Sequence, residues 1–487
     1  MDLTRRPLNL PNSKISKLTN VNDNSLALKE ILHSKLKMSG PIGLDEYMKI
    51  CLYDKKYGYY TTKEHIFGEK GDFITAPEIS QMFGETIAIF LYKVLEESFK
   101  FPYTWDLLEV GAGRGFLMAD ILRSFVDFRC LQGLNVVIVE KSDKLSKIQQ
   151  ENIHNILLKK GVMTEYHYDK ENKIDTFVDK KNRFSMKWFD SLDKYVTHRN
   201  GILFEDSSKN PSRNFLKFTK VEENPRLNPL MIINNELFDA LPTKKFVFSE
   251  NYWREVLVDI ERGETNQNKI ILTQESIPRP DPHEIKFKYT LSPPNSESVV
   301  RYLDPQNTFV EQGIKTKEGD SYEFSPEQIR YMYAMSYLLA TTRQAQALII
   351  DYGEDHAFSD SFRGIKNQKI LKGQDILNHT GECDLTSYIN FKALKRVVYN
   401  YPSLQIGGLM KQGDFLEILQ IYQRLRLLQT GQTSVKNKEL LTKQYEKLTG
   451  ENEMGDNYKF FYIHKKLHNP TYPFIEDILN KLKEENS

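Results

Sequence analysis

The chain has 487 residues, of which 40% are hydrophobic, and this length and composition predict a folded protein of two or three domains. Lys and Arg number 67 against 66 Asp and Glu, so the net charge of +1 gives no long-range attraction for nucleic acid or an acidic membrane. Three isolated cysteines lack metal or disulfide spacing, and no apolar run approaches the roughly 20 residues that span a bilayer. We therefore expect no metal, no nucleic-acid partner and no membrane insertion.

The N-terminal region divides into a tail and a cap. Residues 1–25 carry basic side chains among Ser, Thr and Asn, which resembles an organelle transit peptide or an ordinary flexible tail. Residues 26–100 are predicted to form a helical cap. Within the cap, the glycine-bounded loop GDFITAPEIS feeds a long helix that passes through Pro77. Such a loop beside a nucleotide fold covers a ligand or serves packing alone.

The stretch TWDLLEVGAGRGFLMADILR (104–123) predicts a buried strand, a glycine turn and a helix, and it opens the first half of the core, 101–243. Glycine at 111, 113 and 115 permits positive φ and close approach of a ligand to the backbone. A dinucleotide fingerprint needs glycine at the sixth position, where this chain has Phe116. The spacing therefore disfavours NAD.

Glu109 lies two residues before Gly111 at the end of the strand, where it would repel a pyrophosphate. A carboxylate there suits a cationic aminoacyl group or ribose hydroxyls, and S-adenosylmethionine offers both without a phosphate. We thus expect S-adenosylmethionine as the cofactor, with a tight turn that binds nothing as the alternative. Glu140 closes the next apolar strand, LNVVIV, and is placed to bind the ribose hydroxyls or to cap the following helix.

Two later strand ends carry further candidates. MKWF (186–189) is followed by Asp190, which could contact an adenine amino group or be a surface turn residue. LMII (230–233) runs into NNELFDALP, which places Glu236 and Asp239 at the edge where ligands bind in open α/β sheets. There they could orient an acceptor or take its proton. Alternatively, the preceding asparagines only cap a short helix. The polar segment 205–220 predicts a mobile insertion.

From residue 244 to 324 the pattern predicts an antiparallel β insertion, with strands over 245–260 and 269–276, and a dimer or substrate surface. The second half of the core follows at 325–487. It begins with a helix capped by Ser325 and a strand that ends at Asp351. The later predicted elements are helices over 384–398, 414–429 and 439–450 and strands over 404–412 and 457–465. Together the strands predict an α/β sheet of seven strands with a mixed edge, whose order reverses at the glycine turn.

Several motifs together resemble the MidA-like family of S-adenosylmethionine-dependent methyltransferases, which includes the mitochondrial complex I assembly factor with protein arginine methyltransferase activity. The motifs are GPIGLDEYM, YGYY, GDFITAPEISQMFGE, LEVGAGRGFLMADILR, VEKS, NNELFDALPTKKF, IIDYG, CDLTSYINF, KQGDFLEILQI and EMGDNYKFF. They run from Gly40 to Phe461, nearly the whole chain. The chain departs from the family at Ala112, where proline is usual, and at Phe116, where threonine is common.

The resemblance implies a Rossmann-like, seven-stranded class I methyltransferase sheet with an N-terminal helical cap and an antiparallel β insertion. It also implies an arginine-directed enzyme of the mitochondrial matrix that acts on a protein, such as a respiratory complex subunit, and that could be a homodimer. Carried over by position, the cofactor residues are Glu109, Gly111, Gly113, Gly115, Glu140 and the loop Gly71, Asp72, Phe73, Ile74, Thr75 and Pro77.

An arginine acceptor stays protonated below about pH 12, so a carboxylate must orient it and draw off its proton. Glu236 and Asp239 are the predicted catalytic residues, ahead of Asp72 and Glu78. A catalytically silent assembly chaperone with the same fold is the alternative function. A nicotinamide-dependent oxidoreductase is a third hypothesis, which Phe116 disfavours.

Overall fold

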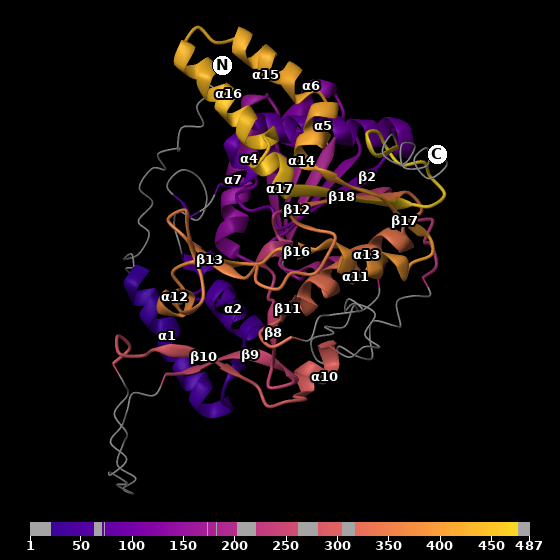
Figure 1. Ribbon diagram of the computed structural model, residues 1–487. Coiled ribbons are helices and arrows are strands. Elements are labelled where there is room, and N and C mark those ends of the chain that lie inside the picture. The colour runs from indigo at the N-terminus through magenta and orange to yellow at the C-terminus, as the bar shows by residue number, and fades with distance from the viewer. Residues whose placement is uncertain are drawn as a thin grey trace, which may run out of the picture.

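The computed structural model describes residues 21–62, 71–72, 74–172, 174–181, 183–201, 221–261, 281–303 and 317–475. A large sheet with helices on both faces forms one part of the molecule, and a smaller unit of N-terminal helices and antiparallel strands lies against it (Figure 1). The strand predicted at 269–276 and the insertion predicted at 205–220 lie outside the described residues.

The large sheet has ten strands, in the order β17-β18-β12-β7-β2-β3-β6-β5-β4, with β16 paired to the end of β12. Their bounds are β2 (Trp105–Val110), β3 (Leu134–Val139), β4 (Thr164–Asp169), β5 (Ile174–Asp179), β6 (Phe184–Phe189), β7 (Leu230–Asn235), β12 (Ala345–Glu354), β16 (Ile389–Asn390), β17 (Leu404–Lys411) and β18 (Tyr458–Lys465). The five strands from β12 to β6 are parallel, and the strands at both edges are antiparallel.

The sheet contains all seven predicted strands and three that the sequence pattern missed. The chain runs from β2 outward through β3 and β6 and then returns to β7 on the other side of β2. The strand order therefore reverses beside the glycine turn, as predicted. The hairpin of β4 and β5 was missed because β4, TEYHYD, is polar and mostly exposed and so shows no apolar alternation.

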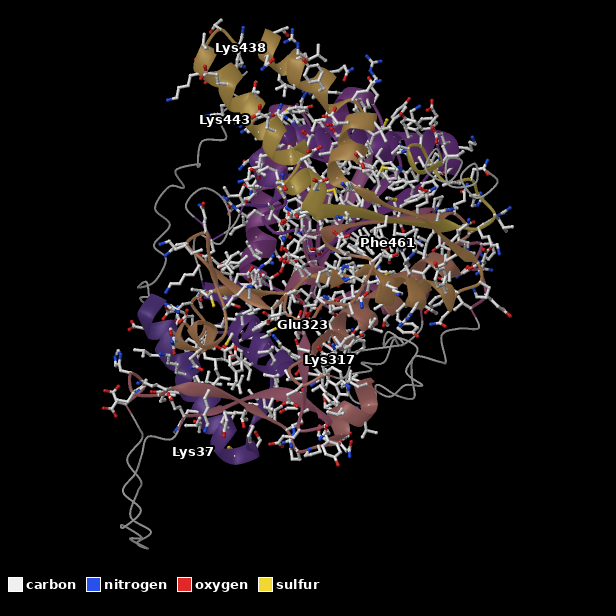
Figure 2. The ribbon with its side chains drawn as sticks, in the orientation of Figure 1. Lys37, Lys317, Glu323, Lys438, Lys443 and Phe461 are labelled. Carbon is white, nitrogen blue, oxygen red and sulfur yellow. The ribbon has the colours of Figure 1, made fainter. Side chains whose placement is uncertain are left out.

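Helices cover both faces of the sheet, and neighbouring residues of one strand face different layers. Leu107 belongs to the apolar cluster under a first layer of helices, and Leu108 belongs to the cluster under a second layer. The first layer comprises α5 (Gln81–Lys93), η1 (Val94–Phe99), α6 (Phe116–Phe128), α7 (Asp143–Lys159), α14 (Gln412–Ile418), α15 (Ile421–Thr430), α16 (Val435–Thr449) and α17 (Met454–Asn457). The second comprises α8 (Leu192–Asn200), α11 (Pro326–Thr341) and α13 (Phe391–Tyr399). Phe461 of β18 lies in the packed interior, and Lys438 and Lys443 mark the outlying α16 (Figure 2).

The smaller unit joins the N-terminal cap to the β insertion. The short β1 pairs with β9 at Ile42 and Val258, and both elements share one apolar cluster with α1 and α2. The cap elements in this unit are α1 (Val21–Ser39), β1 (Ile42–Gly43), α2 (Leu44–Tyr53) and α3 (Tyr59–Thr62), whereas α4 (Ala76–Ile79) packs with α5 and α6 against the large sheet. The insertion elements are β8 (Lys244–Ser249), β9 (Tyr252–Ile260), β10 (Phe287–Leu291), α10 (Glu297–Leu303) and β11 (Ser321–Phe324). Two regions that look separate in sequence thus form one packed unit.

A third sheet covers part of the junction between the two units. It contains β14 (Lys369–Leu371), β13 (Arg363–Lys366) and β15 (Asp384–Thr386), and α12 (Gln374–Asn378) connects β14 to β15. The helix predicted over 384–398 is therefore wrong in its first half. Helix α13 begins only after Asn390, whose Oδ1 accepts a hydrogen bond from the Ala393 backbone N–H at 3.1 Å.

Two other predicted helices are interrupted. The helix through Pro77 divides at Ser80, which is extended and accepts a hydrogen bond from Met82 N–H to start α5. The helix predicted over 414–429 divides at Gln420, whose φ of 66° ends α14 and begins α15. Apolar spacing continues across both breaks, and so the pattern alone did not show them. Among the described residues, no helix is long and apolar enough to cross a membrane.

Candidate functional site

The glycine turn connects β2 to α6 in the predicted way. Gly111, Gly113 and Gly115 have φ values of 75°, 54° and 78°. A Cβ at Gly111 would lie 2.9 Å from Leu237 Cδ1, so this position also needs glycine for space. The Gly111 N–H donates to the Val139 carbonyl at 2.9 Å and ties the turn to β3.

A hollow of about 410 Å³, which we call the glycine hollow, opens above this turn. Its walls come from three places: the α4 segment, the end of β2 with the glycine turn, and the end of β7. The lining residues are Thr75, Pro77, Glu78, Glu109, Gly111, Ala112, Gly113, Arg114, Phe116, Leu117, Asn235 and Glu236. The structure thus brings half of the twelve predicted site residues, Thr75, Pro77, Glu109, Gly111, Gly113 and Glu236, to one place.

The glycine hollow presents acceptor atoms that the protein itself does not use. Glu109 is 2% exposed, and within the part of the chain that the structure describes neither its Oε2 nor the Oδ1 of Asn235 has a hydrogen-bond partner. Burial, with a smaller contribution from the Glu140 charge, raises the pKa of Glu109 to about 8. Leaving a buried acceptor unsatisfied costs about 1–3 kcal/mol. The arrangement therefore fits a ligand that brings cationic or hydroxyl donors.

The charged residues that line the hollow also favour a cationic ligand. Glu78, Glu109 and Glu236 supply carboxylates, whereas Arg114 is the one cation among the residues that line the hollow, with its Nη1 3.6 Å from Glu78 Oε1. A pyrophosphate would oppose the ionisation of Glu109 and Glu236, whose pKa values burial already raises to about 8. A sulfonium and an ammonium would be attracted.

Glu140 lies at the end of β3 as predicted but does not line the hollow. Its two oxygens accept from Ser142 N–H at 2.8 Å and from Gln149 Nε2 at 3.0 Å. Burial raises its pKa to about 7. The cap of α7 is Ser142, which accepts from Leu145 N–H, so Glu140 does not cap this helix itself.

Gln149 is a site residue that the sequence analysis missed. It is fully buried, its Nε2 also donates to the Gly113 carbonyl at 2.8 Å, and its Oε1 accepts from Trp188 Nε1 at 3.2 Å. It therefore clamps the glycine turn to Glu140 and to β6. The available signal was a glutamine within the apolar face of α7, between Leu145 and Ile153.

Of three other predicted cofactor residues, two do not line the hollow and one lies outside the described residues. Asp72 is buried, but its Oδ2 accepts from Tyr59 Oη at 2.6 Å and its Oδ1 from Asn367 N–H at 2.7 Å. Asp190 is exposed at the end of β6 and forms an ion pair with Lys194. Phe73 lies outside the described residues. Asp72 thus anchors its loop, and Asp190 faces solvent.

The two predicted catalytic carboxylates differ in position. Glu236, with φ 52°, lines the hollow, and its Oε1 accepts from Ala76 N–H at 3.0 Å. Burial raises its pKa to about 8. Asp239 lies in the next turn, η4 (Phe238–Ala240), is 8% exposed and is not part of the lining. The η4 turn is held by Asp351, whose Oδ2 accepts from Phe238 N–H at 2.9 Å, and not by the asparagines.

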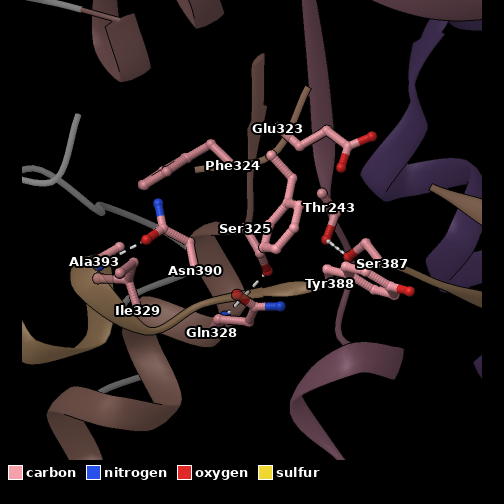
Figure 3. Close-up of a pocket in the computed structure, with 11 residues that line it drawn as sticks. Thr243, Glu323, Phe324, Ser325, Gln328, Ile329, Ser387, Tyr388, Asn390 and Ala393 are labelled. Carbon is pink, nitrogen blue, oxygen red and sulfur yellow. Dashed lines mark hydrogen bonds between the residues drawn. The ribbon is translucent and has the colours of Figure 1, made fainter. Parts of the chain in front are cut away.

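A second hollow, of about 350 Å³, lies further along the same sheet edge, and we call it the Ser325 hollow. Its lining includes Phe324, Phe358 and Tyr388 together with polar side chains that bond to backbone groups or to one another (Figure 3). Ser325 Oγ accepts from Gln328 N–H, as the predicted cap requires, and Thr243 Oγ1 lies 2.9 Å from Ser387 Oγ. These polar groups already have protein partners.

The fold and the glycine hollow together define a class: an α/β enzyme that binds a nucleoside cofactor without using phosphate contacts. Residues 86–409 match the model of a family described as "S-adenosyl-L-methionine-dependent methyltransferase". The chain belongs to this family of S-adenosyl-L-methionine-dependent methyltransferases. S-adenosyl-L-methionine is therefore its cofactor, and the unpartnered acceptors and the glycine cradle of the hollow fit that group.

Named relatives and solved structures agree with the family. The protein arginine methyltransferase NDUFAF7, mitochondrial, of Xenopus tropicalis is 30% identical over 90% of this chain and 85% of its own length. The human protein of the same name is 28% identical over 90% of this chain and 84% of its own length. A COG1565 superfamily member from Burkholderia thailandensis, crystallised with S-adenosyl-homocysteine, has a TM-score of 0.66 at 19% identity, and the match covers 94% of this chain and 96% of that one. At that identity the similarity shows the fold alone.

Proposed function

We propose that the chain is a protein arginine methyltransferase of the complex I assembly type that acts in the mitochondrial matrix. The carboxylate-lined glycine hollow, with its unpartnered Glu109 oxygen, is the observation that carries this proposal. The names of relatives that are similar along nine-tenths of the chain support arginine as the acceptor and the mitochondrion as the location. The seven contiguous strands from β17 to β6 would be the Rossmann-like class I core, extended by β5, β4 and β16.

The residues around the hollow suggest separate roles in holding the cofactor. Glu109 Oε2 and Asn235 Oδ1 would accept from the aminoacyl ammonium, because both are buried and unpartnered. Gly111 and Gly113 would let the backbone approach the cofactor closely. Glu140, positioned by Gln149, would bind the ribose hydroxyls. The exposure of Asp190 and its pairing with Lys194 give no support to the adenine contact expected for it.

When bound, the cofactor supplies a methyl group activated by its sulfonium. The chain has to orient the acceptor, exclude water and accept a proton, because a protonated guanidinium is a poor nucleophile. Glu236 is the better placed of the two predicted carboxylates, since it lines the glycine hollow and Asp239 does not. A raised pKa keeps such a group able to take a proton near neutral pH.

Isotope transfer tests this proposal. The full chain is incubated with S-adenosylmethionine that carries a heavy methyl group and with an extract of mitochondrial matrix proteins, and methylated peptides are identified by mass spectrometry. We expect the heavy methyl on arginine and at least a hundredfold less with Glu236→Gln, as for loss of a general base. No heavy methyl, or label on lysine or glutamine only, would contradict the arginine assignment.

A variant that cannot bind the cofactor distinguishes a catalytic role of the protein from a scaffold role. We expect Gly113→Val to abolish both methyl transfer and the cellular role of the protein. A cellular role that survives this substitution would favour the assembly chaperone.

The homodimer stays a prediction, which light scattering of the purified chain would check.

A further inference from the structure

Two tyrosines pack against each other on neighbouring strands of the large sheet. Tyr352 of β12 and Tyr458 of β18 are paired across antiparallel strands, and their ring centroids lie 5.4 Å apart at an interplanar angle of 73°. Tyr388, which lines the Ser325 hollow, continues the row at 5.2 Å from Tyr352. Because Tyr458 also bonds to Glu236 of the glycine hollow, contacts within this row run from one hollow to the other.

Each tyrosine hydroxyl in the pair is committed to a different carboxylate. Tyr458 Oη donates to Glu236 Oε2 at 3.1 Å, while Glu236 Oε1 accepts from Ala76 N–H at 3.0 Å. Tyr352 Oη donates to Asp239 Oδ2, which also accepts from Thr386 Oγ1 at 2.8 Å. The two predicted catalytic carboxylates thus have separate hydroxyl partners.

The surroundings of the two pairs are unequal. Asp239 has a nearby cation, Arg363, whose guanidinium lies over the rings of Tyr352 and Tyr388 at 5.0 and 4.5 Å. Glu236 has no cation among the groups that act on it most strongly, and it reaches the glycine hollow. The anchored carboxylate is Asp239, and the one exposed to ligand chemistry is Glu236.

We propose that Tyr458 is a positioning residue that holds and tunes Glu236 as the proton acceptor of methyl transfer, while Tyr352 and Asp239 form the structural half of the pair. This inference rests on the proposed function in one respect: it takes methyl transfer as the reaction in which Glu236 accepts the proton. Tyr458 contacts neither cofactor nor acceptor in this assignment and acts through Glu236 alone.

Methyl transfer forms one bond, breaks one bond and releases one proton. The acceptor nitrogen forms a bond to the methyl carbon, the bond between that carbon and sulfur breaks, and its electron pair remains on sulfur. The proton that the acceptor nitrogen loses goes to the Glu236 carboxylate. One hydrogen bond from Tyr458 stabilises the ionised form of Glu236 before transfer and leaves the second oxygen pinned to the α4 backbone.

Several charged groups face Glu236 and set its titration. Asp239 and Asp351 lie on its own sheet edge, and Asp239 raises the pKa of Glu236 whereas the Tyr458 hydroxyl lowers it. Across the hollow lie Glu78 and Glu109 and the guanidinium of Arg114. Removing the Tyr458 hydroxyl leaves these charges in place, so its effect on the pKa of Glu236 can be isolated.

The matched test is Tyr458→Phe against Tyr352→Phe, in the full chain, because both remove one hydroxyl from the same aromatic pair. Two readouts are measured: the acid limb of the pH profile for methyl transfer, and the carboxyl titration of Glu236 by infrared difference spectroscopy, assigned by its loss in Glu236→Gln. Losing a hydrogen bond to a charged group should raise the pKa of Glu236 by about one unit.

We expect Tyr458→Phe to move both the acid limb and the infrared titration upward by about one pH unit, and Tyr352→Phe to leave both in place. Equal shifts in the two variants, or a shift only in Tyr352→Phe, would overturn the assignment. An unshifted infrared titration in Tyr458→Phe would overturn it even without a rate measurement. If the infrared shift occurs in a chain that transfers no methyl group, the proposed function fails and the tuning of Glu236 by Tyr458 stands. Circular dichroism confirms that both variants are folded.

Discussion

The glycine hollow and the Ser325 hollow lie at the same edge of the sheet and have similar volumes, about 410 and 350 Å³. The segment after β7 connects them, since Glu236 lines the first and Thr243 the second. They differ in how their polar atoms are used. Among the described residues, Glu109 Oε2 and Asn235 Oδ1 of the first have no hydrogen-bond partner, whereas the polar side chains of the second are bonded to backbone groups or to one another.

The difference shows that unsatisfied polar atoms identify a ligand site better than volume does. Each unpartnered buried acceptor is unfavourable in the free protein and becomes favourable only when a donor arrives. In the Ser325 hollow, Glu323 already accepts from Ser361 N–H and Phe362 N–H at 3.0 Å each, so a ligand would have to displace existing bonds. We therefore assign ligand binding to the glycine hollow and a structural role to the other.

The largest effect should come from filling the turn itself. Gly111→Val places a side chain against Leu237 and forces a β-branched residue to positive φ. We expect the affinity for S-adenosylmethionine to fall by at least roughly a hundredfold, measured by calorimetry. Gly161→Val is the matched control, because Gly161 has a φ of 73° but no atom within 4 Å of its Cβ position. Equal affinities in the two variants would contradict the assignment.

The next effect concerns the proton on Glu109. Because its pKa is raised to about 8 by burial, the free carboxyl is protonated at neutral pH, whereas a cationic ligand favours the ionised form. Binding should therefore release a proton, and affinity should rise with pH until about pH 8. We expect Glu109→Gln to abolish the linked proton and to weaken binding on the order of tenfold, by calorimetry in buffers of different ionisation enthalpy.

The same substitution has the opposite effect on stability. The folded-state pKa of Glu109 lies above its unfolded-state value near 4.5, so the wild type loses stability as pH rises from about 4.5 towards 8. Glu109→Gln should therefore melt higher than the wild type at pH 7, and the difference should vanish at low pH. A variant that melts lower at pH 7 would show that the carboxylate has a structural partner.

A smaller effect is expected at the clamp behind the turn. Gln149→Leu removes the bonds to Gly113, Glu140 and Trp188 without opening a cavity, and we expect about a tenfold loss of cofactor affinity, as for one or two buried hydrogen bonds. Gln150→Leu is the control on the same helix, since its amide bonds to Asp175, away from the turn. Similar losses in both would indicate a general weakening of α7.

The smallest effect should come from the Ser325 hollow. Ala393→Leu adds three carbon atoms at its wall, and we expect S-adenosylmethionine affinity and the methylation rate to stay within about twofold, because Ala393 lines the Ser325 hollow and not the glycine hollow. Binding is followed by calorimetry and the rate by isotope transfer. A large rise in KM for the protein acceptor would instead make this hollow part of the acceptor path.

Much of the glycine hollow could be predicted from the sequence, since its parts are local. The strand, the turn and Glu109 occupy one short stretch, and the parallel sheet brings the end of β7 beside the end of β2. The helix breaks at Ser80 and Gln420 were missed because apolar spacing does not reveal a single residue that leaves helical geometry.

What the sequence could not show are partnerships between distant segments. The Tyr352 and Asp239 pair is separated by 113 residues, and Gln149 acts only because the ends of β3, β6 and the turn converge on it. Asp190 stays a predicted adenine contact that gains no support from its surroundings. Its position at a strand end was predicted correctly, but Lys194, one helical turn later, holds its side chain at the surface.

A structure of the chain with S-adenosyl-homocysteine tests the central claim most directly. The account predicts the ligand in the glycine hollow, with its aminoacyl nitrogen within hydrogen-bond distance of Glu109 Oε2 and its ribose turned towards Glu140. Ligand density in the Ser325 hollow, or in the glycine hollow with Glu109 still unpartnered, would contradict it.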